Sequence, residues 1–371
     1  MNSNNASLDI QLPPLSALAV DSAVLQPDRL SAAAADALQS LRTEAESVNT
    51  THSYHGALRY WAAWHWLRYG RSMALPLPGT AVLQFIADHG ARRDGDTLRH
   101  ELPPALDALL VQHGFKGKPG PLAPATLAHR IAVLSKAHQS QALPNPCQSV
   151  EVREALSHLR KAHARRGQLP QKKAALTRLP LEQLLATCDD SLKGVRDRAL
   201  LLFAWASGGR RRSEVASADM AWLRPIGHHQ FLYELRLSKT NQAAVERPEN
   251  LKPVVGVAGE ALQRWLTAAH ITQGPIFRRI YKGGRIGQEA LTALSVNHIV
   301  KERCALAGVE GDFSAHSLRS GFVTEAGRQN MALADTMAMT GHHSPATVLG
   351  YFRAEAPLAN QAARLLESPE R

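Results

Sequence analysis

Two segments that lie far apart in the sequence hold side chains able to bind an anion and to exchange protons. In the first, GGRRRSE, a glycine pair ends an apolar run, and three arginines precede Ser213 and Glu214, which indicate the start of a new helix. A guanidinium held by such a turn presents a fixed fork of donors to two phosphate oxygens. The triplet could also be a solvated turn, so its chemistry depends on its neighbours in the fold.

The second segment, residues 316–351, carries His316, Arg319, His342 and Tyr351 within a pattern typical of packed helices, where such groups are costly to bury. His316 and Arg319 are three residues apart on a predicted helix, so both project toward the same point. His342 follows a glycine that ends one helix, and Tyr351 lies on the next. The first pair could be an ordinary surface contact and each histidine a structural hydrogen-bonding group, so no single residue defines a site.

The elements that must position these residues are mostly helices. Residues 1–46 are expected to be a flexible arm, and residues 47–165, with apolar side chains at helical spacing between Gly and Pro punctuation, predict an all-helical domain. A basic linker at 166–178 leads to a second domain at 179–371. There, QFLYELRLSKTNQ alternates apolar and polar residues and PVVGVAG offers a returning strand. The predicted fold class is mainly α (α+β), with a small antiparallel sheet in the second domain.

The composition indicates a polyanionic partner. The chain has 371 residues, is 44% hydrophobic and carries a formal net charge of +11, so its field favours nucleic acid or an anionic membrane surface. It has neither a signal-peptide pattern nor an apolar run long enough to span a membrane, which predicts a soluble cytoplasmic protein with no membrane partner. Its 3 cysteines are widely spaced, which predicts reduced core thiols rather than disulfides or a zinc site.

A run of positive charge without an acidic residue lies where the two predicted domains meet. It ends a predicted helix and continues into the loop-like stretch GQLPQKK. One-sided charge beside a loop favours contact with a nucleic-acid backbone, although a solvated connector remains an open alternative. The residues of this run assigned to DNA binding are Arg160, Lys161, Arg165, Arg166, Lys172 and Lys173.

The order of five features, rather than any one of them, carries a family resemblance. GRRRSE is followed by LSKT at the end of a predicted strand, then by HSLR, then by GH, and then by a tyrosine nine residues after that histidine. This series resembles the tyrosine recombinase (phage integrase) family. The resemblance covers residues 178–360, and the helical region from 47 to 165 resembles the family's core-binding domain more loosely.

The resemblance implies a site-specific recombinase or integrase of a mobile genetic element. Such an enzyme cleaves and rejoins double-stranded DNA through a 3'-phosphotyrosyl intermediate without ATP, metal or another cofactor, and acts as a tetramer when two duplexes exchange strands. Matched residue by residue, the catalytic set is Arg211, Lys239, His316, Arg319, His342 and Tyr351. Arg210 and Arg212, as neighbours of Arg211, would contact nearby phosphates or Glu214. The triple arginine and the SGF after HSLR depart from the family pattern without touching a catalytic group.

These residue types suit the implied chemistry. Tyrosine is a poor nucleophile at its usual pKa of about 10, so Tyr351 needs a base, for which His316 is the first choice. Arg211 and Arg319 would hold the two non-bridging oxygens while negative charge builds in the transition state, and the second histidine would add a third donor. Lys239 would protonate the departing 5'-oxygen as general acid.

Three alternative functions remain open from the sequence. A type IB topoisomerase shares the catalytic groups but relaxes supercoils, and a non-catalytic DNA-binding relative would not need all of them. A metal hydrolase using His316, His342 and His343 lacks H-E-x-x-H or a comparable ligand spacing, so no metal site is predicted. The tail after Tyr351 has an apolar stripe that could pack on its own domain or on a neighbouring protomer.

Overall fold

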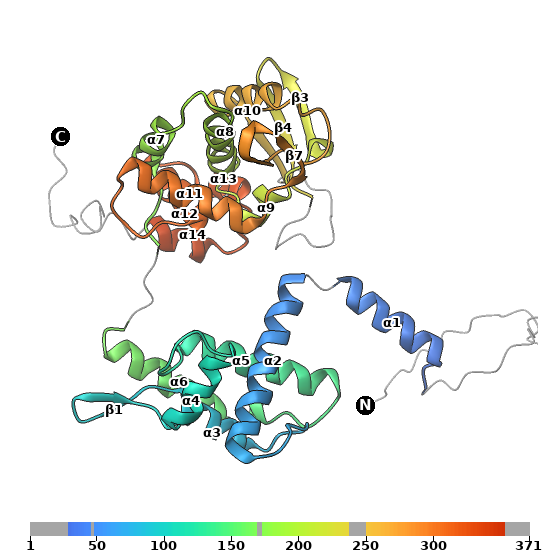
Figure 1. Ribbon diagram of the computed structural model, residues 1–371, viewed down its shortest axis with the longest axis vertical. Helices are drawn as coiled ribbons and strands as arrows, with labels where there is room; N and C mark the ends of the chain where they lie inside the picture. The colour runs from blue at the N-terminus through green and yellow to red at the C-terminus, as the bar shows by residue number, and fades with distance from the viewer. Residues whose placement is uncertain (1–28, 46–47, 169–172, 237–249, 353–371) are drawn as a thin grey trace, which may run out of the picture. The chain divides into compact units, whose positions relative to one another are not determined.

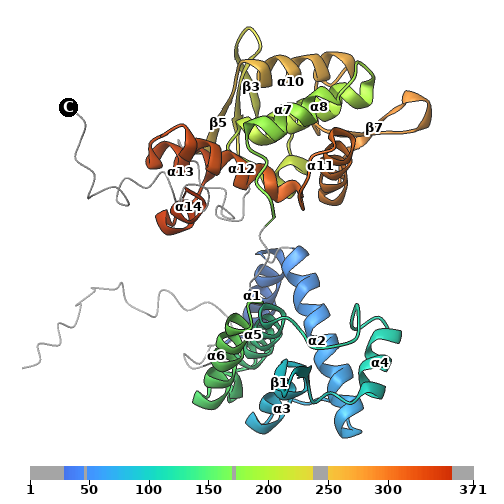
Figure 2. The same cartoon turned by 90° about the vertical axis from the view of Figure 1, so that its left-hand side faces the viewer.

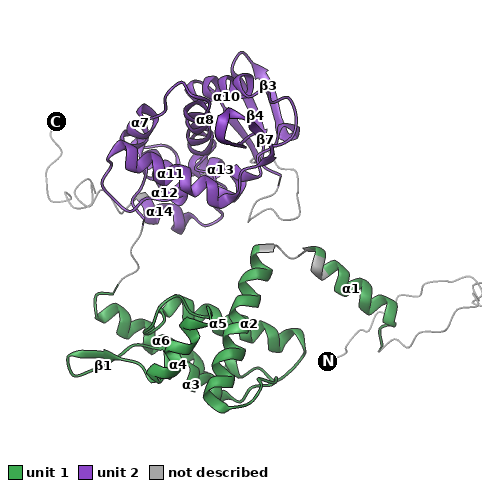
Figure 3. Cartoon of the chain, viewed as in Figure 1, with its two compact units in different colours: residues 1–170 green, residues 171–371 purple. Residues whose placement is uncertain are grey.

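The chain divides into two compact units, unit 1 (residues 1–170) and unit 2 (residues 171–371), coloured green and purple in Figure 3. Each unit has its own hydrophobic core. The residues that the computed structural model describes are 29–45, 48–168, 173–236 and 250–352.

Unit 1 consists of helices and one small hairpin (Figure 1). Its helices are α1 (Ala32–Ala45), α2 (Val48–Tyr69), α3 (Gly79–His89), α4 (Pro104–Gln112), α5 (Pro124–Ser140) and α6 (Val150–Arg165), with a 3-10 turn at Pro146–Gln148. The hairpin joins β1 (Arg92–Asp94) to β2 (Thr97–Arg99) and departs from the predicted all-helical pattern. Its short strands are exposed and lack apolar alternation, so the only sequence signal for them is the favoured loop pair Gly95-Asp96.

Aromatic rings fill the core of unit 1. Tyr60, Trp61 and Trp64 of α2 are fully buried, and Trp61 stacks on Phe85 of α3 with ring centroids 3.6 Å apart. The indole of Trp64 donates to a carboxylate oxygen of buried Asp88 at 2.8 Å. These contacts fix α2 against α3, and α6 packs on α3 as well, so the surface shared by α3 and α6 rests on a rigid core.

Unit 2 is mostly helical with two small antiparallel sheets, as the predicted fold class requires. Its helices are α7 (Arg178–Ala186), α8 (Leu192–Ala206), α9 (Arg212–Ala216), α10 (Val257–Ala268), α11 (Ala293–Ala307), α12 (Ala315–Arg328), α13 (Leu333–Thr340) and α14 (Pro345–Phe352), with 3-10 turns at Met220–Trp222 and Lys282–Gly284. One sheet has the order β3 (Leu223–Gly227), β4 (Gln230–Glu234), β5 (Leu251–Val254), and the other pairs β6 (Arg278–Ile280) with β7 (Ile286–Ala290). The two predicted strands correspond to β4 and β5, with Phe231 opposite Val254.

Helix α8 lies in the middle of unit 2 and packs against α10 and α12 (Figures 1 and 2). Its side chain Phe203 is fully buried, as is Trp265 of α10. The buried carboxylate of Asp197 on α8 accepts from Arg196 and from Arg303 of α11, each at 2.7 Å. Apolar packing and this charge cluster together hold α10 and α11 to the central helix.

Helix α12, which carries the H-x-x-R pair, is bound by the first described residues of unit 2. Ala174 N–H donates to the carbonyl of Asp312 at 3.1 Å, and Leu176 N–H donates to that of Ser317 at 2.9 Å. The indole of Trp205 donates to the carbonyl of Leu176 at 3.1 Å. The segment before α7 therefore runs along the start of α12 and is held there from α8.

Among the described residues, no helix is long and apolar enough to cross a membrane. The same residues contain no group of three or more His, Cys, Asp or Glu side chains that could hold a metal ion. Cys147, Cys188 and Cys304 are buried free thiols, and burial raises the pKa of each. The prediction of core cysteines is thus confirmed.

Candidate functional site

Two glycines between α8 and α9 let the chain approach α12 and α13 closely. Gly208 and Gly209 have positive φ angles of 96° and 67°. A Cβ atom on Gly208 would lie 2.2 Å from the carbonyl oxygen of Met339, and one on Gly209 would lie 2.4 Å from the Cα of Arg319. Only glycine fits these positions, and the arginine triplet that follows is therefore held against both helices.

Arg211 is held at the start of α9 by a buried carboxylate. Its Nη1 donates to Glu214 Oε1 at 2.7 Å, and its backbone N–H donates to Glu214 Oε2 at 3.1 Å. The Glu214 side chain is 3% exposed, whereas that of Arg211 is 28% exposed. The guanidinium is therefore fixed by the protein and still reaches solvent, which is the arrangement that anion binding requires.

Arg319 of α12 is a buried guanidinium with unused hydrogen-bonding capacity. The residue is 2% exposed, its Nη1 donates to the carbonyl of Gly209 at 3.3 Å, and its Nη2 has no partner among the described residues. Burial and the neighbouring charges of Arg210 and Arg211 lower its pKa to about 10, so it remains charged at neutral pH. A buried N–H without an acceptor is costly, and an incoming anion would remove that cost.

Both predicted site histidines feel these arginine charges. His316 is exposed on one side, and partial burial together with Arg319 and Arg211 lowers its pKa below the usual value. His342 is half-buried, and burial, followed by the same two arginines, lowers its pKa to about 4. Its Nδ1 lies 2.8 Å from the hydroxyl of Thr340. Near neutral pH both rings are therefore uncharged and can accept a proton.

Tyr351 lies on α14, which packs against α12 and α13. Its side chain is half-buried, and negative charge on its phenol would raise the pKa of Arg319, so the two groups lie within electrostatic reach. Lys239 lies outside the described residues. The predicted residues that the structure brings together are Arg211, His316, Arg319, His342 and Tyr351.

The other two arginines of the triplet lie in different surroundings, one exposed and one buried. Arg212 is exposed at the start of α9. Arg210, expected at a nearby phosphate or at Glu214, lies at Glu214: it is 1% exposed, and its Nη1 lies 3.6 Å from Glu214 Oε2. Its Nη2 donates to the carbonyl of Met339 at 2.6 Å. Its backbone N–H closes the turn onto the carbonyl of Ala204 at 2.7 Å, at the end of buried α8.

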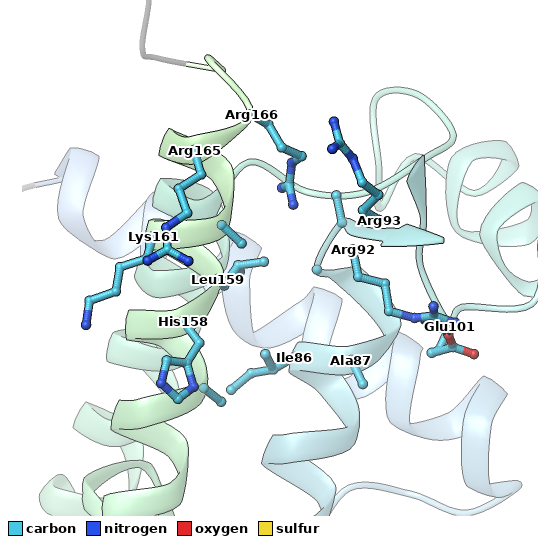
Figure 4. A pocket seen from close by; sticks show the side chains of 14 residues that line it. Ile86, Ala87, Arg92, Arg93, Glu101, His158, Leu159, Lys161, Arg165 and Arg166 are labelled. Carbon is cyan, nitrogen blue, oxygen red and sulfur yellow. Dashed lines mark hydrogen bonds and ion pairs between the residues drawn. The ribbon is translucent and has the colours of Figure 1, made fainter. Parts of the chain in front are cut away.

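A second candidate site is a groove of about 850 Å³ in unit 1, here called the basic groove (Figure 4). It lies between α3, β1 and α6, and Ile86 and Leu159 are among its apolar lining residues. Arg92 donates from Nε to Glu101 at 2.9 Å. The basic side chains that line the groove are Arg92, Arg93, Lys161, Arg165 and Arg166.

The predicted basic run divides between different surroundings. Lys161 and Arg165 reach the groove together because they are four residues apart on α6, and Arg166 joins them from the C-terminal cap of that helix. Arg160 is exposed on α6 but does not line the groove. Lys173 forms an ion pair with Asp312, and Lys172 lies outside the described residues.

Two groups of basic residues were not singled out from the sequence. Arg92 and Arg93 precede the β1–β2 turn, and that loop pair is the signal that could have placed them on a hairpin. The β6–β7 hairpin, which projects from unit 2 in Figure 2, is the other. At its tip, exposed Tyr281 lies beneath the guanidinium of Arg279, 5.0 Å away, and that of Arg285, 4.4 Å away. The stretch RRIYKGGR, without an acidic residue, carried that signal.

Comparisons with known proteins each match part of this chain. Residues 175–357 match the model of the phage integrase family. A curated protein of Selenomonas ruminantium described as "Integrase/recombinase xerD homolog" is 31% identical over 241 residues, which span 61% of this chain and 67% of that protein. The solved structure of the Tn1549 transposon integrase in complex with transposon right end DNA has a TM-score of 0.53 at 14% identity, covering 86% of this chain and 94% of that one. The solved structure of a lambda integrase dimer bound to a COC' core site has a TM-score of 0.50 at 14% identity, covering 86% of this chain and 93% of that one.

Proposed function

This chain belongs to the phage integrase family of tyrosine recombinases, and from that membership we propose that it cuts and rejoins double-stranded DNA at specific sites. The observation that carries the proposal is the cluster in unit 2. Arg211 and Arg319 lie with two uncharged histidines beside the helix of Tyr351, and Arg319 holds a buried N–H without a partner. A scissile phosphate supplies the acceptor oxygens that this cluster lacks. Family membership also favours strand exchange over the topoisomerase alternative.

In the proposed reaction, the phenolic oxygen of Tyr351 forms a bond to phosphorus and the bond to the 5'-oxygen breaks. The tyrosine proton passes to His316, whose lowered pKa keeps its ring free to accept it. The two arginines hold the non-bridging oxygens as their charge grows, and His342 is a further phosphate ligand. The product is a 3'-phosphotyrosine and a free 5'-hydroxyl. Attack by another strand's 5'-hydroxyl reverses the step, so rejoining needs no ATP.

Lys239 is the proposed general acid for the 5'-oxygen, by its position in the LSKT motif. Lys239→Ala is expected to slow DNA cleavage by about 10²- to 10⁴-fold, the usual loss when a general acid is removed. Binding of the duplex is expected to change little. Single-turnover cleavage of a duplex carrying the target site measures the rate, and fluorescence titration measures the affinity.

A modified substrate separates this role from general electrostatics. Sulfur in place of the bridging 5'-oxygen leaves as an anion without a proton, so Lys239→Ala is expected to recover most of its rate on that duplex. The matched control is Arg211→Ala, which is not expected to recover, because charge grows on the non-bridging oxygens whichever atom leaves. Rescue of Arg211→Ala with no rescue of Lys239→Ala would show that the acid is another residue.

We also propose that the basic groove of unit 1 contacts the DNA backbone. Its positive side chains come from two separate elements, β1 and α6, and one carboxylate, Glu101, lines the groove with them. Several phosphates of one duplex could therefore be bound along it, largely without regard to sequence. The exposed cations of the β6–β7 hairpin are a further proposed backbone contact, by the same charge complementarity.

The salt dependence of binding tests the groove. Replacing Arg93 and Arg165 together with glutamine is expected to flatten the slope of log affinity against log salt by about 1.8, because each phosphate contact contributes about 0.9. The matched control replaces Lys118 and Lys136, which are exposed in unit 1 outside the groove lining. The control slope is expected to stay at the wild-type value. Equal flattening in both variants would contradict a specific role for the groove.

Three finer features belong to the same proposal. Exchange between two duplexes requires four strand cuts, which supports a tetramer as the active assembly on DNA. Membership in a family that includes phage integrases supports a role in a mobile genetic element. Action on cellular DNA supports a cytoplasmic location.

A further inference from the structure

Two buried cationic side chains donate hydrogen bonds to the last turn of α13, the helix that leads into His342. Arg210, from the turn between α8 and α9, donates from Nη2 to the carbonyl of Met339 at 2.6 Å. Lys252, from β5, donates from Nζ to the carbonyl of Ala338 at 2.5 Å. Each of the two residues is 1% exposed. Two elements far apart in the sequence thus bind consecutive carbonyls of one short helix.

These contacts satisfy two of the carbonyls at the end of the helix. The last four carbonyls of an α-helix lack partners within it. Here the carbonyl of Met337 accepts from the N–H of the capping residue Gly341 at 2.8 Å, and the two cations take the next two carbonyls. Positive charge is favoured at this end of a helix by its dipole. These two hydrogen bonds therefore stabilise the end of α13 through cations that are themselves buried.

The same turn holds the ring of His342. The hydroxyl of Thr340 donates to the carbonyl of Thr336 at 2.7 Å, and the Nδ1 of His342 lies 2.8 Å from that hydroxyl oxygen. Because a hydroxyl has one proton, which goes to Thr336, Nδ1 of His342 is the donor in the second bond. Nε2 then donates to a phosphate oxygen once the ring takes up a proton, which the negative charge of a bound phosphate favours. Thr340 is itself 1% exposed, so the ring is tied to a buried, fixed point.

From these contacts we infer that Arg210, Lys252 and Thr340 are positioning residues for His342. The two cations fix the end of α13 against the site, and the threonine hydroxyl fixes the imidazole on that end. The inference rests on the proposed role of His342 as a phosphate ligand. It also gives Arg210 a role inside the protein instead of at the DNA.

A double-mutant cycle with His342 tests the inference. Lys252→Met keeps the apolar stem and removes the donor, and Thr340→Val keeps the shape and removes the hydroxyl. Each is expected to slow single-turnover cleavage at saturating DNA, by up to about 10²-fold, since a misplaced catalytic group costs that much. The dissociation constant for DNA is expected to stay near the wild-type value. In a His342→Ala background the same substitutions are expected to have almost no further effect, because the group they position is gone.

Further variants and a folding measurement distinguish a positioning role from a purely structural one. Arg210→Lys, which retains a charged donor, is expected to cleave faster than Arg210→Met. Thermal unfolding reports whether Lys252→Met folds. If it does not fold, the shape-conserving Thr340→Val alone tests the positioning of His342. Undiminished losses in the His342→Ala background would make these residues merely structural and overturn the inference alone. A wild-type cleavage rate for His342→Ala would remove the proposed phosphate ligand, and the inference with it.

Discussion

Tyr351→Phe is expected to form no covalent protein–DNA product, while it binds its DNA as the unmodified protein does. The substitution removes only the oxygen that attacks phosphorus and keeps the aromatic ring at position 351 of α14. Incubation with a duplex carrying the target site, followed by denaturation in SDS, separates linked from free DNA. For the unmodified protein, digestion of the linked product is expected to leave a phosphotyrosine at position 351.

Tyr281→Phe is the matched control for this experiment. Tyr281 is an exposed tyrosine of the same unit, at the tip of the β6–β7 hairpin, and its hydroxyl has no part in the proposed chemistry. Its adduct yield is expected to match that of the unmodified protein. A chelating agent is also expected to leave cleavage intact. An undiminished adduct from Tyr351→Phe would show that the nucleophile is a different residue.

Arg319→Ala is expected to lower the single-turnover cleavage rate by about 10³- to 10⁵-fold, the range for an arginine that stabilises a phosphoryl-transfer transition state. The large effect follows from its burial, because charge stabilisation is stronger where water is excluded. Arg319→Lys keeps the charge but not the fork of donors, so its cleavage rate is expected to lie between those of the unmodified protein and Arg319→Ala. Rates measured at saturating DNA separate this loss from weaker binding.

Arg212→Ala provides the comparison for Arg319→Ala. Arg212 neighbours Arg211 but is exposed, so at saturating DNA its removal is expected to leave the cleavage rate near the wild-type value. Similar losses in both variants would mean that total positive charge, rather than a buried ligand for the phosphate, governs the rate.

Helical spacing made part of the site predictable from the sequence. His316 and Arg319 were expected on one helix face, and both lie on α12 and interact with Arg211. The inward direction of Arg210 was not predictable, because it follows from the close approach of Gly208 to Met339, more than a hundred residues later in the chain. A contact of that kind leaves no local pattern, so the triplet showed where an arginine was needed but not which one faced inward.

The surroundings of the basic run were also only partly predictable from the sequence. The sequence displayed it as one stretch of charge, but α6 continues to Arg165 and its period selects which residues share a face. Other contacts depend on the tertiary fold. Lys173 pairs with Asp312, which lies far along the chain, and Arg93 reaches the groove from a hairpin that has no apolar alternation. Linear charge therefore indicated a polyanionic partner but not which basic side chains share one surface.

The attachment of residues 174–176 to α12 has a mechanical consequence. Among the described residues of unit 2, this segment is the one nearest in sequence to unit 1, and its backbone hydrogen bonds go to Asp312 and Ser317, at the start of the helix that carries His316 and Arg319. A pull on the chain before this segment therefore loads those two bonds before it reaches the sheet or α10. In this sense α12 anchors the connecting chain, and tension along that chain acts on the helix that carries Arg319.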